Sequence, residues 1–235
     1  MEFNIKRFFT GVILLLAILF FFYFKYDIYF IAFLSFLIVY DLVYSKILTI
    51  NFSILLILIL SLIFYHFKDN LFFYFIFPLT VFITIYVKSY RNFFFILNLI
   101  LFILFCTEMS IIDRSYLYYI ILLSFVNDTS AYIFGRFLKG PKITPNISPN
   151  KTYSGTIISS IISYLLILFL FDLGYMVSFV AAISFFIGDI YFSFIKRKYF
   201  LKDFSNLLSG HGGILDRLDS IFFCTYLLLF YFKIH

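Results

Sequence analysis

Long apolar segments recur along the whole chain, separated by short groups of polar and charged residues. A ~30 Å hydrocarbon core needs about 20 apolar residues in a helix, and lipid offers no partner to an unpaired backbone group. Each segment therefore predicts a transmembrane α-helix, although the fifth and the last are short enough to be tilted or only partly embedded. The predicted segments are Phe8–Phe24, Tyr26–Tyr44, Ile47–Phe67, Leu71–Val87, Phe93–Cys106, Tyr116–Gly135, Thr156–Phe171, Leu173–Ile195 and Leu218–Phe232.

The pattern predicts an all-α, polytopic integral membrane protein of about nine transmembrane helices. Composition agrees, because 64% of the 235 residues are hydrophobic and 13% are charged, against ~25% charged in soluble domains. No small-residue cleavage site follows the first apolar run, so we interpret it as a retained anchor and not a signal peptide. Cys106 and Cys224 lie in separate apolar runs and are interpreted as buried hydrophobic residues.

The basic residues sort to one side of the predicted membrane. With a cytoplasmic N-terminus, alternation of the helices places 14 of the 18 Lys and Arg on the cytoplasmic side. The remaining four are Lys25, Lys68, Arg114 and Lys233. The chain is thus predicted to have N-in, C-out topology in the inner (cytoplasmic) membrane of the cell.

The two halves of the chain differ in their connections. Residues 1–115 have short connections and are predicted to form a helical scaffold, whereas residues 116–235 are predicted to form the catalytic region. This second region has two long cytoplasmic loops, Arg136–Gly155 and Lys196–Arg217, which hold three of the four prolines and many basic residues. Loops of this length are usually functional or disordered, and here their composition favours function.

Two carboxylates, Asp128 and Asp189, lie in apolar segments, where a charge costs ~2.5 to 3.5 kcal/mol near the bilayer centre. Such residues are functional candidates, the alternative being a structural ion pair. Helical spacing extends each into a polar stripe that ends at the basic side, which predicts a shared cavity open to the cytoplasm. The stripes are Asp189, Ser193, Lys196 and Arg197 on one helix and Asp128, Tyr132, Gly135 and Arg136 on another.

The stretch SGHGGILDRLDS, residues 209–220, precedes the last apolar segment. Its glycines, including Gly212 and Gly213, allow backbone N–H groups to approach an anion. Asp216 and Asp219 place two carboxylates on one helical turn, and oxygen ligands of this kind suit Mg²⁺ better than Zn²⁺. His211 is predicted to cap, orient or contact phosphate. Carboxylates, a glycine-rich loop and many cations together indicate a polyphosphate site.

The run SFIKRKYFLKDFSNLLSGHGGILDRLD, residues 193–219, resembles the signature of phosphatidate cytidylyltransferases, which are also called CDP-diacylglycerol synthases. The upstream segments NDTSAYIFGR and ISPNKTYSGT resemble two further elements of that family. Together these matches cover about the C-terminal half. One position departs from the family pattern, because Ser154 stands where the family usually has Glu.

The resemblance implies that CTP and phosphatidate react to give CDP-diacylglycerol and pyrophosphate, with Mg²⁺ as cofactor and a second cation left open. It also suggests a homodimer, and no nucleic acid is expected as a partner. It assigns the metal to Asp189, Asp216 and Asp219, and catalysis to these residues with Ser193, Lys196 and Arg197. The implied substrate-binding residues are Asp128, Tyr132, Arg136, Lys142, Lys151, Thr152, Lys202, Asp203, His211, Gly212, Gly213 and Arg217.

Three alternatives remain open from the sequence. An ion-coupled transporter predicts related halves and polar residues spread through the bilayer depth, but the polar residues here cluster in one half. Another CTP-dependent membrane enzyme, such as a polyprenol or dolichol kinase, has acidic intramembrane motifs as well, but the intact HGG–DR–D run favours the cytidylyltransferase. A catalytically inactive scaffold is suggested only by Ser154.

Overall fold

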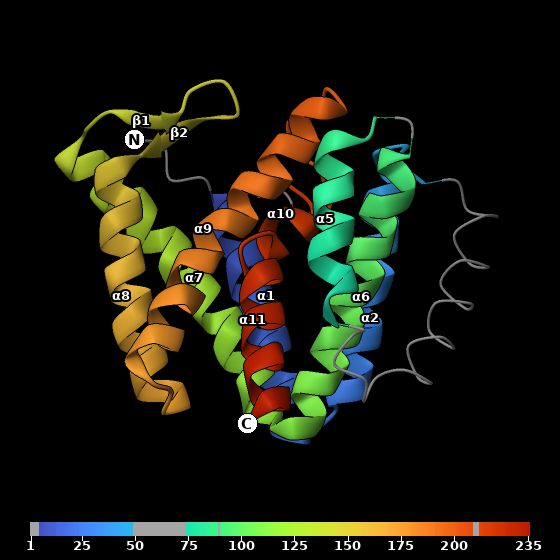
Figure 1. Cartoon of the computed structure of the whole chain (residues 1–235), viewed down its shortest axis with the longest axis vertical. Helices are drawn as coiled ribbons and strands as arrows, with labels where there is room; N and C mark the ends of the chain where they lie inside the picture. Colours follow the sequence, from blue (N-terminus) through green and yellow to red (C-terminus); the bar gives the residue numbers. More distant parts are fainter. Residues whose placement is uncertain (1–4, 49–73, 89, 209–211) are drawn as a thin grey trace.

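The fold is a bundle of helices of unequal length, capped at one end by a small β-hairpin (Figure 1). The structure is a computed structural model and describes residues 5–48, 74–88, 90–208 and 212–235. The helices are α1 (Ile5–Phe24), α2 (Asp27–Tyr44), α5 (Ile76–Tyr86), α6 (Arg91–Ile112), α7 (Arg114–Leu138), α8 (Tyr153–Phe171), α9 (Tyr175–Lys198), α10 (Leu215–Leu218) and α11 (Ile221–Ile234). The strands are β1 (Lys142–Thr144) and β2 (Ser148–Thr152), which pair antiparallel.

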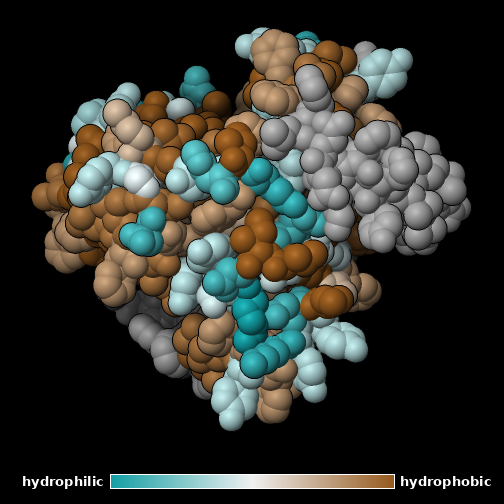
Figure 2. All heavy atoms as spheres, turned by 60° about the horizontal axis from the view of Figure 1, so that its bottom comes forward, coloured by the Kyte–Doolittle hydropathy of each residue, from teal (hydrophilic) through white to brown (hydrophobic). Residues whose placement is uncertain are grey.

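The predicted fold class is confirmed. Five described helices, α2, α6, α7, α8 and α9, are long and apolar enough to cross a membrane, and the described part of α1 together with α5 and α11 forms shorter apolar helices. Figure 2 shows apolar side chains over much of the face in view, with a narrower run of hydrophilic side chains across it. Most of the predicted third segment, Ile47–Phe67, lies outside the described residues, so the total of nine stays a prediction.

The fifth and the last predicted segments differ from the helices in the structure. The fifth segment was expected to end at Cys106, but α6 continues to Ile112. Polar side chains in this extra turn are satisfied locally or across the bundle: Ser110 Oγ donates to the Thr107 carbonyl (2.8 Å), and Lys233 Nζ donates to Glu108 (2.9 Å). The last segment is divided, because α10 ends at Leu218 before α11 begins at Ile221.

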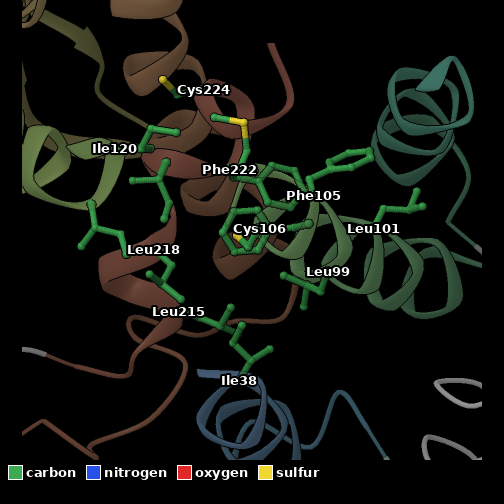
Figure 3. Packing of buried hydrophobic residues seen from close by; sticks show 14 of the residues in the cluster. Ile38, Leu99, Leu101, Phe105, Cys106, Ile120, Leu215, Leu218, Phe222 and Cys224 are labelled. Atoms are coloured by element: carbon green, nitrogen blue, oxygen red, sulfur yellow. The ribbon is translucent and has the colours of Figure 1, made fainter. Parts of the chain in front are cut away.

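The core lies where α2, α6, α10 and α11 meet (Figure 3). Leu99 and Phe105 of α6, Leu215 of α10 and Phe222 of α11 are almost fully buried. Cys106 and Cys224 are free, buried thiols within this core, which confirms the interpretation from the sequence. Burial of such side chains packs the short α10 against the first half of the chain, so the site described below has a rigid base.

The long connections of the second half gather at one end of the bundle. Figure 1 shows the hairpin and the C-terminal end of α9 at the top, and the α8–α9 turn and the C-terminus at the bottom. Arg197 Nε donates to the Ile147 carbonyl (3.1 Å), which joins the end of α9 to the hairpin. The helix pair α7 and α8 is closely packed, because a Cβ on Gly155 would lie 2.5 Å from the Ala131 carbonyl oxygen. β2 of the hairpin packs against α7 and α8, and a hydrogen bond joins the hairpin to the end of α9.

Candidate active site

A polar cavity of about 510 Å³ lies among α7, the hairpin, α8, α9 and the segment before α11. It brings together the whole predicted stripe of α9 and the first two residues, Asp128 and Tyr132, of the predicted stripe of α7, whereas Gly135 and Arg136 do not line it. Most residues chosen from the sequence line it: Asp128, Tyr132, Lys151, Thr152, Asp189, Ser193, Lys196, Arg197, Lys202, Asp203, Asp216, Arg217 and Asp219. Residues of both predicted stripes therefore share a cavity, and its opening to the cytoplasm stays a prediction.

Five chosen residues lie elsewhere or are not described. Arg136 and Lys142 are exposed and do not line the cavity, and Arg136 Nη1 donates instead to the Tyr132 hydroxyl (3.1 Å). Gly212 and Gly213 do not line the cavity, and both contact Asp216, which does. His211 lies outside the described residues.

Lys196 is the central cation of the cavity floor. Its Nζ donates to Asp216 Oδ1 (2.7 Å) and lies 3.9 Å from Asp219 Oδ2. All three side chains are buried. The ammonium group thus offsets two carboxylates that would otherwise repel each other in a region poor in water.

Asp216 organises the segment around it. Its Oδ2 accepts backbone hydrogen bonds from Phe204 and Gly213, both at 2.9 Å. Gly212 adopts a positive φ of 78°, and a Cβ there would lie 2.8 Å from Asp216 Oδ2. The glycines were expected to expose N–H groups to a bound anion, and in the structure the anion that the Gly213 N–H contacts is the chain's own Asp216.

A second group of carboxylates faces the cavity from three elements. Lys151 of β2 forms an ion pair with Asp189 of α9, and Asp128 of α7 and Asp219 are close enough to Asp189 to interact electrostatically. Burial raises the pKa of Asp219, which precedes α11, well above its usual value, and the negative charge of Asp189 raises it further. The charge of Lys196 opposes this rise.

The donor chemistry fits a hard divalent cation, because carboxylate oxygens are the ligands that Mg²⁺ takes in proteins. Among the described residues, however, no three His, Cys, Asp or Glu side chains are arranged to hold one metal ion. Lysines balance the carboxylates instead, and both Asp216 oxygens already accept hydrogen bonds. The metal assignment to Asp189, Asp216 and Asp219 therefore stays a prediction.

Asp41 is a component of this region that the sequence reasoning missed. It lies in α2, is fully buried, and accepts hydrogen bonds from Ser205 Oγ (2.6 Å) and the Leu215 N–H (2.8 Å). The signal was present, since Asp41 is a carboxylate in an apolar segment like Asp128 and Asp189. The predicted scaffold half thus contributes to the structure of the site.

Ser154, the departure from the family pattern, lies outside the cavity lining. Its Oγ donates to the Lys139 carbonyl (2.8 Å) and lies 3.3 Å from Thr152 Oγ1. Ser154 therefore connects the end of α7 to the start of α8, which is a local structural contact.

Comparison with protein families agrees with this geometry. The model of the cytidylyltransferase family matches residues 5–235. The chain belongs to the cytidylyltransferase family. The family match and the apolar helices agree with a helical membrane protein, and the polar cavity is lined by lysine and arginine.

Curated relatives support the same family. The chain is 41% identical over 122 residues to a phosphatidate cytidylyltransferase of Staphylococcus haemolyticus. The matched region covers 48% of this chain and 47% of the relative. It is 42% identical over 67 residues to a phosphatidate cytidylyltransferase of Helicobacter pylori, covering 27% and 25%. A putative phosphatidate cytidylyltransferase of Mycoplasma pneumoniae is 54% identical over 48 residues, covering 20% and 11%. The matches thus span half or less of the length of these relatives.

Proposed function

We propose that this protein is a phosphatidate cytidylyltransferase, which transfers the cytidylyl group of CTP to phosphatidate. The observation that carries the proposal is the polar cavity in which carboxylates from α7, α9 and the segment before α11 meet basic residues of β2 and α9. The names of the relatives in Staphylococcus haemolyticus and Helicobacter pylori support this choice of substrate.

In the proposed reaction, a phosphate oxygen of the lipid attacks the α-phosphorus of CTP. One P–O bond forms, the bond between the α-phosphorus and the oxygen bridging to the β-phosphate breaks, and pyrophosphate leaves. The lipid phosphate is already an anion near neutral pH, so no side chain needs to remove a proton from it. Catalysis then depends on positioning and on neutralising charge.

The basic residues of the cavity are suited to that task. We assign the CTP phosphates to Lys196, Arg197 and Lys202, which line the cavity. Lys151 and Arg217 line it as well and are assigned to the lipid phosphate or the nucleotide. Ser193, buried on α9 one turn from Asp189, is assigned a hydrogen bond beside the proposed metal. A guanidinium group binds phosphate through two parallel hydrogen bonds, whereas an ammonium group acts as a point charge.

The proposed cofactor is Mg²⁺, held by Asp189 and Asp219 together with Asp216. When bound, the ion would supply positive charge to the phosphates. The buried Asp219 beside Asp189 supports this assignment, because their mutual repulsion would be relieved by a divalent cation. Lys151 and Lys196 hold these carboxylates in the described structure.

The site is proposed to face the cytoplasm. CTP is a cytoplasmic nucleotide and the acyl tails of the lipid stay in the bilayer, so the reaction needs a cavity where the two phases meet. The gathering of the hairpin and the end of α9 at one end of the bundle (Figure 1) supports such a placement, as does the sorting of basic residues. A homodimer remains part of the proposal only through the family resemblance.

A transfer assay tests the proposal directly. Membranes containing the protein are mixed with phosphatidate, Mg²⁺ and CTP labelled in the cytidine, and label in the organic phase is counted. We expect transfer by the wild-type protein and none by Asp189→Asn. Asp172→Asn, at the exposed α8–α9 turn, is the matched control and should retain activity.

The outcomes are separable. No lipid-soluble label with folded wild-type protein would contradict the proposed activity. Full activity in both Asp189→Asn and Asp216→Asn would instead remove the metal role and leave the activity standing. Activity loss in Asp189→Asn is the easier of the two to interpret, because Asp216 also accepts hydrogen bonds from the backbone N–H groups of Phe204 and Gly213.

A further inference from the structure

A second cavity, of about 500 Å³ and mostly apolar, lies between α1 and α7. We call it the α1–α7 groove. On α7 most of its lining residues are spaced three and four apart and lie on one helix face: Tyr118, Ile121, Leu122, Phe125, Asp128 and Thr129. Tyr119 and Val126 complete the lining on this helix. On α1 it is lined by Leu15, Ile18, Leu19 and Phe22.

The groove borders the polar cavity. Asp128 and Arg217 line both, so the two spaces meet at these side chains. The remainder of the groove presents almost only apolar side chains. One end is therefore charged and next to the proposed reaction centre, while the rest suits a hydrocarbon chain.

Phe22 and Tyr118 line the opposite end of the groove, and their side chains are held in place. The rings of Phe22 and Tyr118 meet edge to face, with centroids 5.1 Å apart. The Tyr118 hydroxyl donates to Asp27 Oδ1 (2.8 Å), and Arg114 Nε donates to Asp27 Oδ2 (3.1 Å). Arg114 also lies over the Phe22 ring at 5.0 Å. These contacts fix the α1–α2 turn against the start of α7.

We propose that the α1–α7 groove binds one acyl chain of the lipid substrate and that the Phe22–Tyr118 pair limits its length. The inference rests on the proposed function, because it names the lipid that reacts in the polar cavity. In this arrangement Arg217 is positioned for the phosphate monoester at the junction. Tyr118 and Asp128 are ten residues apart on α7, a helical rise of about 15 Å. That length is about half of a ~30 Å hydrocarbon core.

Chain-length selectivity tests the length limit. Phe22, which is 37% exposed, is replaced by Ala to remove the proposed length limit. Wild type and Phe22→Ala are assayed with phosphatidates of increasing acyl length at saturating CTP. We expect the preferred length to shift upward in the variant, with KM for CTP unchanged. An unchanged length profile would overturn the length limit.

Filling the groove tests its occupancy. Leu122 lines the groove and is 51% exposed, so Leu122→Trp would occupy space without entering the polar cavity. Ile133, also exposed on α7 at 40% but outside the groove lining, gives the matched control Ile133→Trp. We expect Leu122→Trp to raise KM for long-chain phosphatidate at least fivefold relative to short-chain phosphatidate. Equal effects of the two tryptophans, or an equal effect on all chain lengths, would contradict the proposal.

A binding readout separates this inference from the proposed activity. Phosphatidate with a photoreactive group near the middle of one acyl chain is crosslinked to the protein in membranes, without CTP. We expect labelled peptides from α1 and α7, with less labelling in Leu122→Trp. Photoreactive phosphatidylcholine, which lacks the phosphate monoester, is the comparison. Equal labelling by both lipids would show that bulk lipid fills the groove, and labelling elsewhere would show that another segment or a second copy covers it. Either result overturns the inference even if transfer activity is present.

Discussion

Asp41 accepts a hydrogen bond from the backbone N–H of Leu215, 2.8 Å from its Oδ2, although the two residues are 174 positions apart. The other oxygen of Asp41 accepts from Ser205 Oγ at 2.6 Å. One buried carboxylate in α2 thus accepts hydrogen bonds from both ends of the segment between Ser205 and Leu215, which leads directly to Asp216. Asp41 is a positioning residue, because it does not line the polar cavity itself.

We expect Asp41→Ala to lower activity by reducing the order of this segment. The change leaves the Ser205 hydroxyl and the Leu215 N–H without this buried acceptor, at a cost of about 1–3 kcal/mol for each unsatisfied group. In the transfer assay, KM for CTP should rise and kcat should fall, while membrane insertion stays normal.

Asp41→Asn separates charge from hydrogen bonding at this position. It keeps one acceptor oxygen, so we expect activity between that of wild type and Asp41→Ala. Loss of thermal stability with unchanged KM and kcat in the remaining folded protein would limit Asp41 to a general structural role.

Lys196 provides a second prediction, because it is the buried partner of Asp216 (2.7 Å). Removing one member of a buried pair leaves an uncompensated charge and typically costs about 3–5 kcal/mol. We therefore expect Lys196→Met to lower the unfolding temperature in detergent and to abolish transfer. The exposed Lys198 on the same helix, changed to Met, should leave both nearly unaltered.

A double variant distinguishes the two roles of Lys196. Lys196→Met with Asp216→Asn removes both charges of the pair, so part of the lost stability should return. Activity should not return with it, since the proposed phosphate contact is still missing. Recovery of activity together with stability would show that Lys196 acts only through folding.

The local spacing of residues predicted the cavity because helical periodicity fixes which side chains share a face. Asp128 and Tyr132 on α7, and Asp189, Ser193 and Lys196 on α9, needed no knowledge of the rest of the chain. Asp41 was missed because its role depends on a contact with residues that are distant in sequence. No sequence spacing reports such a contact. A structural ion pair was left open as an alternative for Asp189, but its partner Lys151, and the pairing of Lys196 with Asp216, were not identified for the same reason.

Gly188 illustrates another long-range constraint, the close approach of α9 to the α10–α11 connection. A Cβ on Gly188 would lie 2.4 Å from the Asp219 carbonyl oxygen and 2.9 Å from that of Ser220. Because both are backbone atoms, the helix itself would have to move, and overpacking of this kind costs about 1–3 kcal/mol. We expect Gly188→Ala to displace Asp189 from Asp219 and to reduce transfer activity at least tenfold.

Gly174→Ala is the matched control for this prediction. Gly174 precedes α9 with a φ of −59°, and a Cβ there would meet no atom within 4 Å. The activity and thermal stability of Gly174→Ala should equal those of the wild-type protein. Equal activity in Gly188→Ala would show that the distance between α9 and the α10–α11 connection does not limit the reaction.

Ser154 provides the last prediction, since a serine at this position raised the alternative of an inactive scaffold. Its hydroxyl contacts the Lys139 carbonyl and Thr152 Oγ1 and lies outside the polar cavity lining. Loss of one such hydrogen bond costs about 1 kcal/mol. We therefore expect Ser154→Ala to lower the unfolding temperature by a few degrees while KM for CTP and kcat stay within twofold of wild type. Thr152→Val is the informative comparison, because Thr152 lines the cavity and its Oγ1 accepts the Gly155 N–H at the start of α8. A large loss of kcat in Ser154→Ala alone would place this position in the reaction after all, and would make the absence of glutamate a functional difference.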